Sequence, residues 1–110
     1  MSNRLRPLVL AAIAFATPAS AYTIIDGSGE SIDPATLATV LEAVSDQLLD
    51  PGAAQFRHIR ISKRPDMICG EINAKNGYGA YVGFQPFYSL GIDRASLPPP
   101  QIGGISADCR

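Results

Sequence analysis

The chain has 110 residues, which is the size of one small domain. Nine basic and ten acidic side chains leave a formal net charge of −1. Because no positive surplus is available for phosphate contacts, the composition argues against nucleic acid as a partner.

Residues 1–21 have the three-part order of a secretory signal peptide. Two arginines precede an unbroken apolar run, residues 8–16, which is too short to span a bilayer. Pro18 and then small residues follow, so we expect signal peptidase to cleave between Ala21 and Tyr22. The alternative, a buried N-terminal helix, does not account for this order of regions.

Export would determine the state of the two cysteines, Cys69 and Cys109, which both lie in the expected mature domain, residues 22–110. In an oxidising compartment a cysteine pair favours a disulfide, and closing so long a loop should stabilise the domain by about 4 kcal/mol. The alternative, two reactive thiols, lacks a C-x-x-C spacing. We therefore expect a periplasmic or secreted domain with no membrane span in its mature form.

The mature chain opens with a short apolar segment, residues 22–25, that suits an edge strand. Asp33 and Pro34 then mark the start of a helix, because the carboxylate can cap free N–H groups and proline is tolerated in the first turn. A stripe of apolar residues at helical spacing predicts an amphipathic helix over residues 34–49. The stripe consists of Leu37, Val40, Leu41, Val44 and Leu48.

The hydrophobic period then changes to two, which predicts strands over residues 57–63, 67–75 and 80–88. In the first of these strands, Ile59 and Ile61 should lie on one face. His58 should lie on the other face together with Phe56.

The hairpin between the second and third strands has two possible registers. One sets Ile72 beside Val82 and Phe84, whereas a two-residue turn sets it beside Tyr81. The first buries more apolar surface, so we expect it, with a loop of three or five residues that uses glycine at positive φ.

These elements predict an α+β fold with one amphipathic helix packed on a three-stranded, mainly antiparallel sheet and one disulfide. A proline-rich tail starts at about residue 90; it is interpreted as a stiff spacer, the alternative being a ligand for a groove. The expected core is Leu37, Val40, Leu41, Val44, Leu48, Phe56, Ile59, Ile61, Ile68, Ile72, Val82 and Phe84.

His58 is the single histidine of the chain, and catalysis would require a serine or an acid beside it in space. A solvent-facing strand position is the simpler reading. With both cysteines bridged, too few ligands remain for zinc. No nucleotide, calcium or hydrolase motif occurs, so we expect no cofactor and no metal, and we assign no catalytic residue.

The densest group of polar residues lies in and around the predicted hairpin. Alternating positions bring polar side chains and an aromatic ring to one face, which could form a shallow recognition surface. The alternative is a solvated face on which asparagines tie down a turn. The candidate binding residues are Glu71, Asn73, Lys75, Asn76 and Tyr81.

The same region carries a resemblance. The pattern D-P-x-x-A-x-F-R at residues 50–57, followed by C-G-E-I-N-x-K-N from Cys69 and G-x-Y-x-G-F from Gly79, resembles short exported proteins of Gram-negative bacteria that have no established activity. The resemblance covers about residues 50–87 and the late cysteine. It implies a bacterial periplasmic or secreted setting and supplies no catalytic residue.

Three functions are compatible with this sequence. The first is a small non-catalytic cell-envelope protein, an accessory module that binds a protein or an envelope component. The second is a secreted inhibitor or effector of a foreign protein. The third is a small hydrolase that uses His58 with Glu71 or a serine; it requires His58 to lie within about 6 Å of a carboxylate or hydroxyl.

Overall fold

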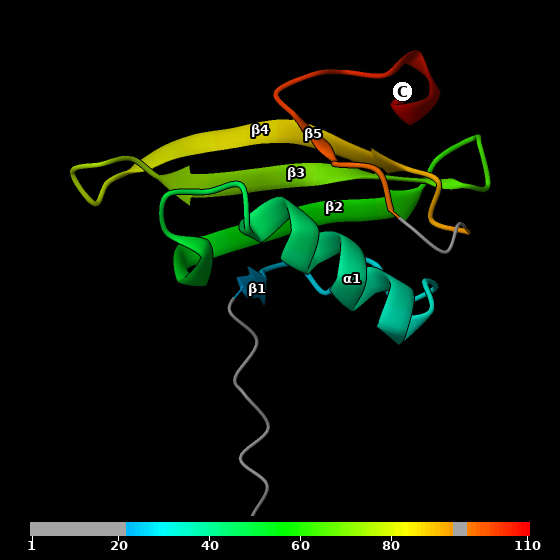
Figure 1. Ribbon diagram of the computed structural model, residues 1–110, viewed down its shortest axis with the longest axis horizontal. Helices are drawn as coiled ribbons and strands as arrows, with labels where there is room; N and C mark the ends of the chain where they lie inside the picture. The colour runs from blue at the N-terminus through cyan, green and yellow to red at the C-terminus, as the bar shows by residue number, and fades with distance from the viewer. Residues whose placement is uncertain (1–21, 94–96) are drawn as a thin grey trace, which may run out of the picture.

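The computed structural model describes residues 22–93 and 97–110 (Figure 1). The predicted signal peptide and Ala21 lie outside the described residues; Tyr22 is the first described residue. The elements in chain order are β1 (Tyr22–Ile24), α1 (Pro34–Ser45), the 3-10 turn η1 (Pro51–Ala53), β2 (Ala54–Ile61), β3 (Met67–Lys75), β4 (Tyr81–Leu90), β5 (Gln101–Ile102) and the 3-10 turn η2 (Ala107–Cys109).

The strands form one mixed sheet in the order β1-β2-β3-β4-β5. β1 runs parallel to β2, and every other neighbouring pair is antiparallel. The α+β class, the one α-helix within the described residues and the Cys69–Cys109 disulfide are confirmed. The prediction of a three-stranded, mainly antiparallel sheet was wrong. One additional strand is the opening segment, which forms an edge strand, as its sequence suggested, and runs parallel to β2. The other is in the tail, which returns to the edge of β4.

The helix starts as its sequence predicts. An Asp33 side-chain oxygen accepts a hydrogen bond from the Thr36 backbone N–H at 3.0 Å, and Pro34 occupies the first turn. It ends at Ser45, earlier than the predicted residue 49. Leu49 is 82% exposed and therefore adds nothing to the buried stripe.

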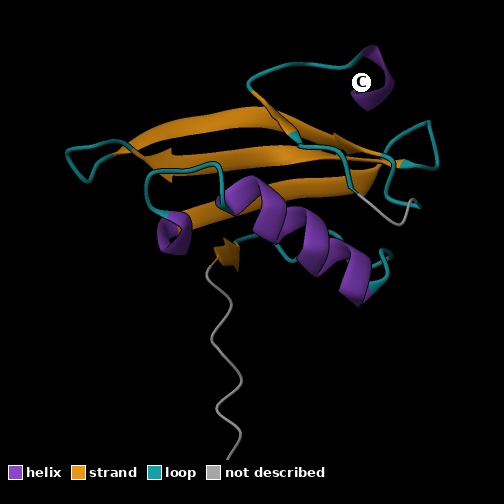
Figure 2. Ribbon diagram, in the orientation of Figure 1, coloured by secondary structure: helices purple, strands orange, loops and turns teal. Residues whose placement is uncertain are grey.

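The helix covers one face of the sheet, and the C-terminal segment lies over the other (Figure 2). We call the first the core face and the second the outer face. The buried residues on the core side are Ile32, Val40, Leu41, Val44, Ala54, Phe56, Ile59, Ile68, Ile72 and Phe87. Seven of them were expected in the core from the sequence. Leu37 and Leu48 are partly buried against this cluster.

The hairpin between β3 and β4 has a five-residue loop, one of the two predicted lengths, but its strands do not keep the predicted register. Lys75 pairs with Tyr81, whereas Asn73 pairs with Phe84, so two residues of β4 oppose one of β3. This β-bulge exchanges the faces of β4. Ile72 therefore opposes Gln85, and Val82 is 59% exposed instead of buried.

Phe84 consequently lies on the outer face. Phe87 takes the place in the core that the sequence had predicted for Phe84. Phe87 lies directly opposite Gly70, where no side chain competes for the space. Its ring stacks edge-on against Phe56 with centroids 5.4 Å apart. The bulge thus exchanges one core phenylalanine for another.

A second bulge interrupts β2. Arg57 pairs with Glu71, but Arg60 pairs with Cys69, so two residues oppose Gly70 alone. The extra residue lets both Phe56 and Ile59 face the core, with 0% and 4% exposure. The expectation that Phe56 shares a face with His58 was wrong for this reason. Ile61 is the last residue of β2 and is 43% exposed, which also contradicts the prediction.

Candidate functional site

A pocket of about 440 Å³ lies on the outer face, between the sheet and the C-terminal segment. We call it the outer-face pocket. Strands β2, β3 and β4 supply its floor, and the segment after β5 supplies its wall. Its lining residues are His58, Arg60, Cys69, Gly70, Glu71, Pro86, Phe87, Gly104, Ile105 and Cys109.

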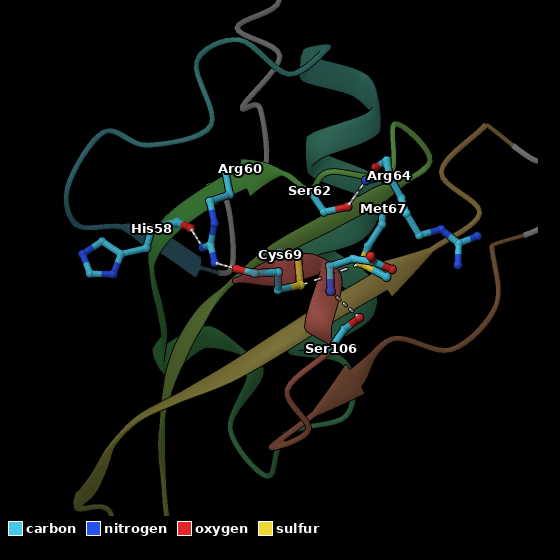
Figure 3. The surroundings of a disulfide bond; sticks show 9 residues. His58, Arg60, Ser62, Arg64, Met67, Cys69 and Ser106 are labelled. Carbon is cyan, nitrogen blue, oxygen red and sulfur yellow. Dashed lines mark hydrogen bonds between the residues drawn. A yellow bond between two sulfur atoms is a disulfide. The ribbon is translucent and has the colours of Figure 1, made fainter.

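Several bonds hold the C-terminal wall against the sheet. The disulfide joins Cys109 to Cys69 of β3 with a Cα–Cα distance of 5.8 Å. The Arg60 guanidinium donates to the Cys109 carbonyl (Figure 3). The Lys63 N–H donates to the Asp108 carbonyl at 3.3 Å. The pocket therefore depends on the predicted disulfide and on polar contacts from the tail that the sequence does not reveal.

His58 occupies the bulge of β2 at the rim of this pocket. Its φ is +54°, and it is the one non-glycine residue with a positive φ in the described part of the chain. Two hydrogen bonds hold this conformation: its N–H donates to Asp26 at 2.9 Å, and its carbonyl accepts from Arg60 at 2.7 Å. Backbone strain of this kind persists where surrounding contacts over-determine it, and it is concentrated at functional sites.

The side chain of His58 contacts Glu71. The distance from His58 Nδ1 to Glu71 Oε1 is 3.1 Å, and Arg57 Nε donates to the other carboxylate oxygen at 2.7 Å. The hydrogen bond from Arg57 lowers the pKa of Glu71, and the contact with His58 acts in the same direction. An ionised carboxylate only accepts hydrogen bonds, so the Nδ1 atom carries the proton in this pair.

Two further contacts extend this group of side chains. The Arg57 guanidinium lies 3.7 Å from the centroid of the Phe84 ring. This cation–π contact holds the guanidinium on the outer face. Asp26 binds the N–H of His58 and the hydroxyl of Ser28, and these bonds lower its pKa to about 2. Charged groups of both signs thus surround His58.

The five predicted binding residues do not gather in one place. Glu71 lines the outer-face pocket. Asn73 is buried; its side chain accepts from the Gly83 N–H and donates to Gln55. Asn76 accepts from two backbone N–H groups of the hairpin loop. Lys75 and Tyr81 pair across the hairpin, with the ammonium 5.3 Å from the ring centroid.

Sequence reasoning missed several residues of the pocket. Arg60 and Ile105 carried no motif. The interpretation of His58 as a solvent-facing residue agrees with its 58% exposed side chain, but the sequence did not place it at the rim of a pocket. The one available signal was the bulge itself: Phe56 and Ile59 are both strongly apolar and three positions apart, which strict alternation cannot place on one face.

Within residues 22–93 and 97–110, no group of three or more histidine, cysteine, aspartate or glutamate side chains is arranged to hold a metal ion. The described helix is neither long nor apolar enough to cross a membrane. Comparisons with protein-family models, curated proteins and solved structures gave no significant match to the chain.

Proposed function

We propose that this protein is an exported, non-catalytic accessory module of the bacterial cell envelope that binds a partner protein or an envelope component at the outer-face pocket. The observation that carries the proposal is the strained His58 at the rim of a preformed pocket. Such a conformation costs about 1–3 kcal/mol, so its presence favours a functional role over a purely solvated surface.

The lining of the pocket supports binding. Apolar groups from Pro86 and Ile105 can cover a ligand, and His58 and Arg60 can fix its orientation. The polar groups are already held by other bonds, so little side-chain freedom would be lost when a ligand enters.

Export is supported by the disulfide, since such bonds persist mainly in oxidising compartments. Mass spectrometry of the protein from the producing cell tests this part. A mature N-terminus at Tyr22 and a blocked thiol pair are expected. An intact Met1 or two alkylatable thiols would contradict export.

Filling the pocket tests the binding function. Ile105 is 64% exposed and lines the pocket, so Ile105→Trp should obstruct it without disturbing the core. Leu49→Trp is the matched control, because Leu49 is 82% exposed and lies outside the pocket. In capture from periplasmic extract, Ile105→Trp should lose a partner that the wild type and the control retain. Identical capture by all three proteins would count against the pocket.

A second candidate is a small hydrolase in which His58 acts as a general base. It is favoured by the 3.1 Å contact with Glu71, which can orient the imidazole as an acid orients a catalytic histidine. Hydrolysis of p-nitrophenyl esters by the wild type, lost in both His58→Asn and Glu71→Gln, would support this candidate over simple binding. Rates equal to the buffer control would eliminate it for this substrate class.

A further inference from the structure

The end of the β3–β4 hairpin extends beyond the rest of the sheet (Figure 1). β2 pairs with β3 only as far as Asn73, and β5 pairs with β4 only at Phe87 and Tyr88. Residues 74–84 therefore form a two-stranded ribbon without a neighbouring strand on either side. We call this segment the hairpin finger.

An isolated two-stranded ribbon is marginally stable in water, but this one is held by several side chains at its base. The Tyr81 hydroxyl donates to the Ala53 carbonyl at 2.9 Å. Asn73 joins the bulge at Gly83 to Gln55 of β2. These bonds fix the direction in which the finger leaves the sheet.

The loop at the tip is held as well. The Asn76 side chain accepts from the N–H groups of Tyr78 and Ala80 at 2.9 and 3.2 Å. The backbone adds bonds from the Asn76 N–H to the Ala80 carbonyl and from the Gly79 N–H to the Asn76 carbonyl. The tip is therefore a preorganised loop.

The hairpin finger presents apolar surface to solvent, both at its loop and at the start of β4. Tyr78 is 98% exposed, Val82 is 59% exposed and Tyr81 is 42% exposed. Lys75 is the single charged residue of the finger, which carries no acidic side chain. A projecting tyrosine on a held backbone has the character of a binding hot spot, because tyrosine supplies a large contact area at low entropic cost.

We propose that the hairpin finger docks into a partner protein through Tyr78, which enters an apolar cleft whose rim carries carboxylates that face Lys75. Preorganisation favours a protein cleft of matching shape over a fluid bilayer. The tip is also exposed at Gly77, whose backbone amide would lose its hydrogen bond to water in hydrocarbon but can find an acceptor on a protein. This surface is separate from the outer-face pocket.

Site-specific photo-crosslinking tests the proposal in the bacterium that produces the protein. p-Benzoyl-phenylalanine is placed at position 78 and, as a matched control, at the exposed position 49. A protein adduct specific to position 78 is expected. No specific adduct, an adduct with lipid or an adduct with a second copy of this chain would each overturn the proposal.

The partner identified in the adduct is then purified without crosslinking, and its affinity for the unmodified full chain is measured by calorimetry. Tyr78→Ala should weaken binding by about tenfold or more, and Val82→Ser should weaken it less. Leu49→Ala and the pocket variant Ile105→Trp should leave it unchanged. Equal affinity for the wild type and Tyr78→Ala would overturn the proposal, whereas loss only in Ile105→Trp would assign the partner to the outer-face pocket instead.

Discussion

Phe87 lies directly opposite Gly70 across β3 and β4, and its ring fills the space in which a side chain at position 70 would begin. A Cβ atom on Gly70 would lie 2.6 Å from one ring carbon of Phe87 and 2.7 Å from the next. Phe87 is 1% exposed and packs against Phe56, so its ring has little room to move. The core face therefore requires glycine at this position.

Gly70→Ala should destabilise the fold by about 1–3 kcal/mol, because the added methyl group overpacks a filled core. Chemical denaturation followed by circular dichroism measures the effect. Gly77→Ala is the matched control, since a Cβ there meets no atom within 4 Å. Similar losses in the two variants would show that the Phe87 ring does not cause the change.

The buried hydroxyl of Ser89 offers a route to a more stable protein. Its oxygen lies in the core without a hydrogen-bond partner among the described residues, and Ser89 is 0% exposed. Ser89→Ala should raise the free energy of unfolding by about 1 kcal/mol, since it removes an unsatisfied polar group. Ser45→Ala is the control, because the equally buried Ser45 hydroxyl donates to the Leu41 carbonyl at 2.7 Å. A gain in the control and none in Ser89→Ala would contradict this reasoning.

The disulfide should carry a large share of the stability of so small a domain. Cys69 and Cys109 are separated by 40 positions, and removing the cross-link in Cys69→Ala/Cys109→Ala should cost up to about 4 kcal/mol. Urea denaturation with and without dithiothreitol measures this cost. The wild type should lose stability when reduced, while the double variant should not respond. A reduced wild type as stable as the oxidised form would show that the tail contacts suffice without the bond.

Asp26 should make stability depend on pH below about 4. Hydrogen bonds from the His58 N–H and from Ser28 lower the pKa of Asp26 from 3.8 to about 2 in the folded protein. Because the folded value lies below the unfolded one, the stabilisation is complete above pH 3.8 and is lost as the pH falls toward 2. Unfolding midpoints of the wild type should therefore fall more steeply over this interval than those of Asp26→Asn. Parallel curves would show that other carboxyl groups dominate.

The sequence predicted the parts of the fold that follow local rules. Asp33 and Pro34 placed the start of α1, and the spacing of Val40, Leu41 and Val44 identified its buried stripe. The two cysteines of an expected exported chain predicted their pairing. Each of these inferences depends on a capping preference, a periodicity or a count, and none requires knowledge of distant neighbours.

The remaining features depend on neighbours that are distant in the sequence. Strict alternation cannot reveal a bulge, because the extra residue is specified by tertiary contacts: Asp26 holds the bulge at His58, and Asn73 holds the bulge at Gly83. The candidate site shares this difficulty. Glu71 was identified from its polar surroundings, whereas Arg60 joins the pocket through the bulged pairing of β2 with β3, and Ile105 joins it because the tail is fixed across the outer face.

The bulge at Gly83 can be tested directly. Gly83 has a φ of +99°, a conformation that side chains rarely adopt, although a Cβ there would meet no atom within 4 Å. Gly83→Ala should therefore destabilise the protein through backbone strain alone, by about 1–2 kcal/mol. Gly77→Ala in the same hairpin serves as the control, because it introduces the same methyl group into open space without a positive φ. If the two variants proved equally stable, β4 would be able to pair without the bulge, and the register that buries Phe87 would need another cause.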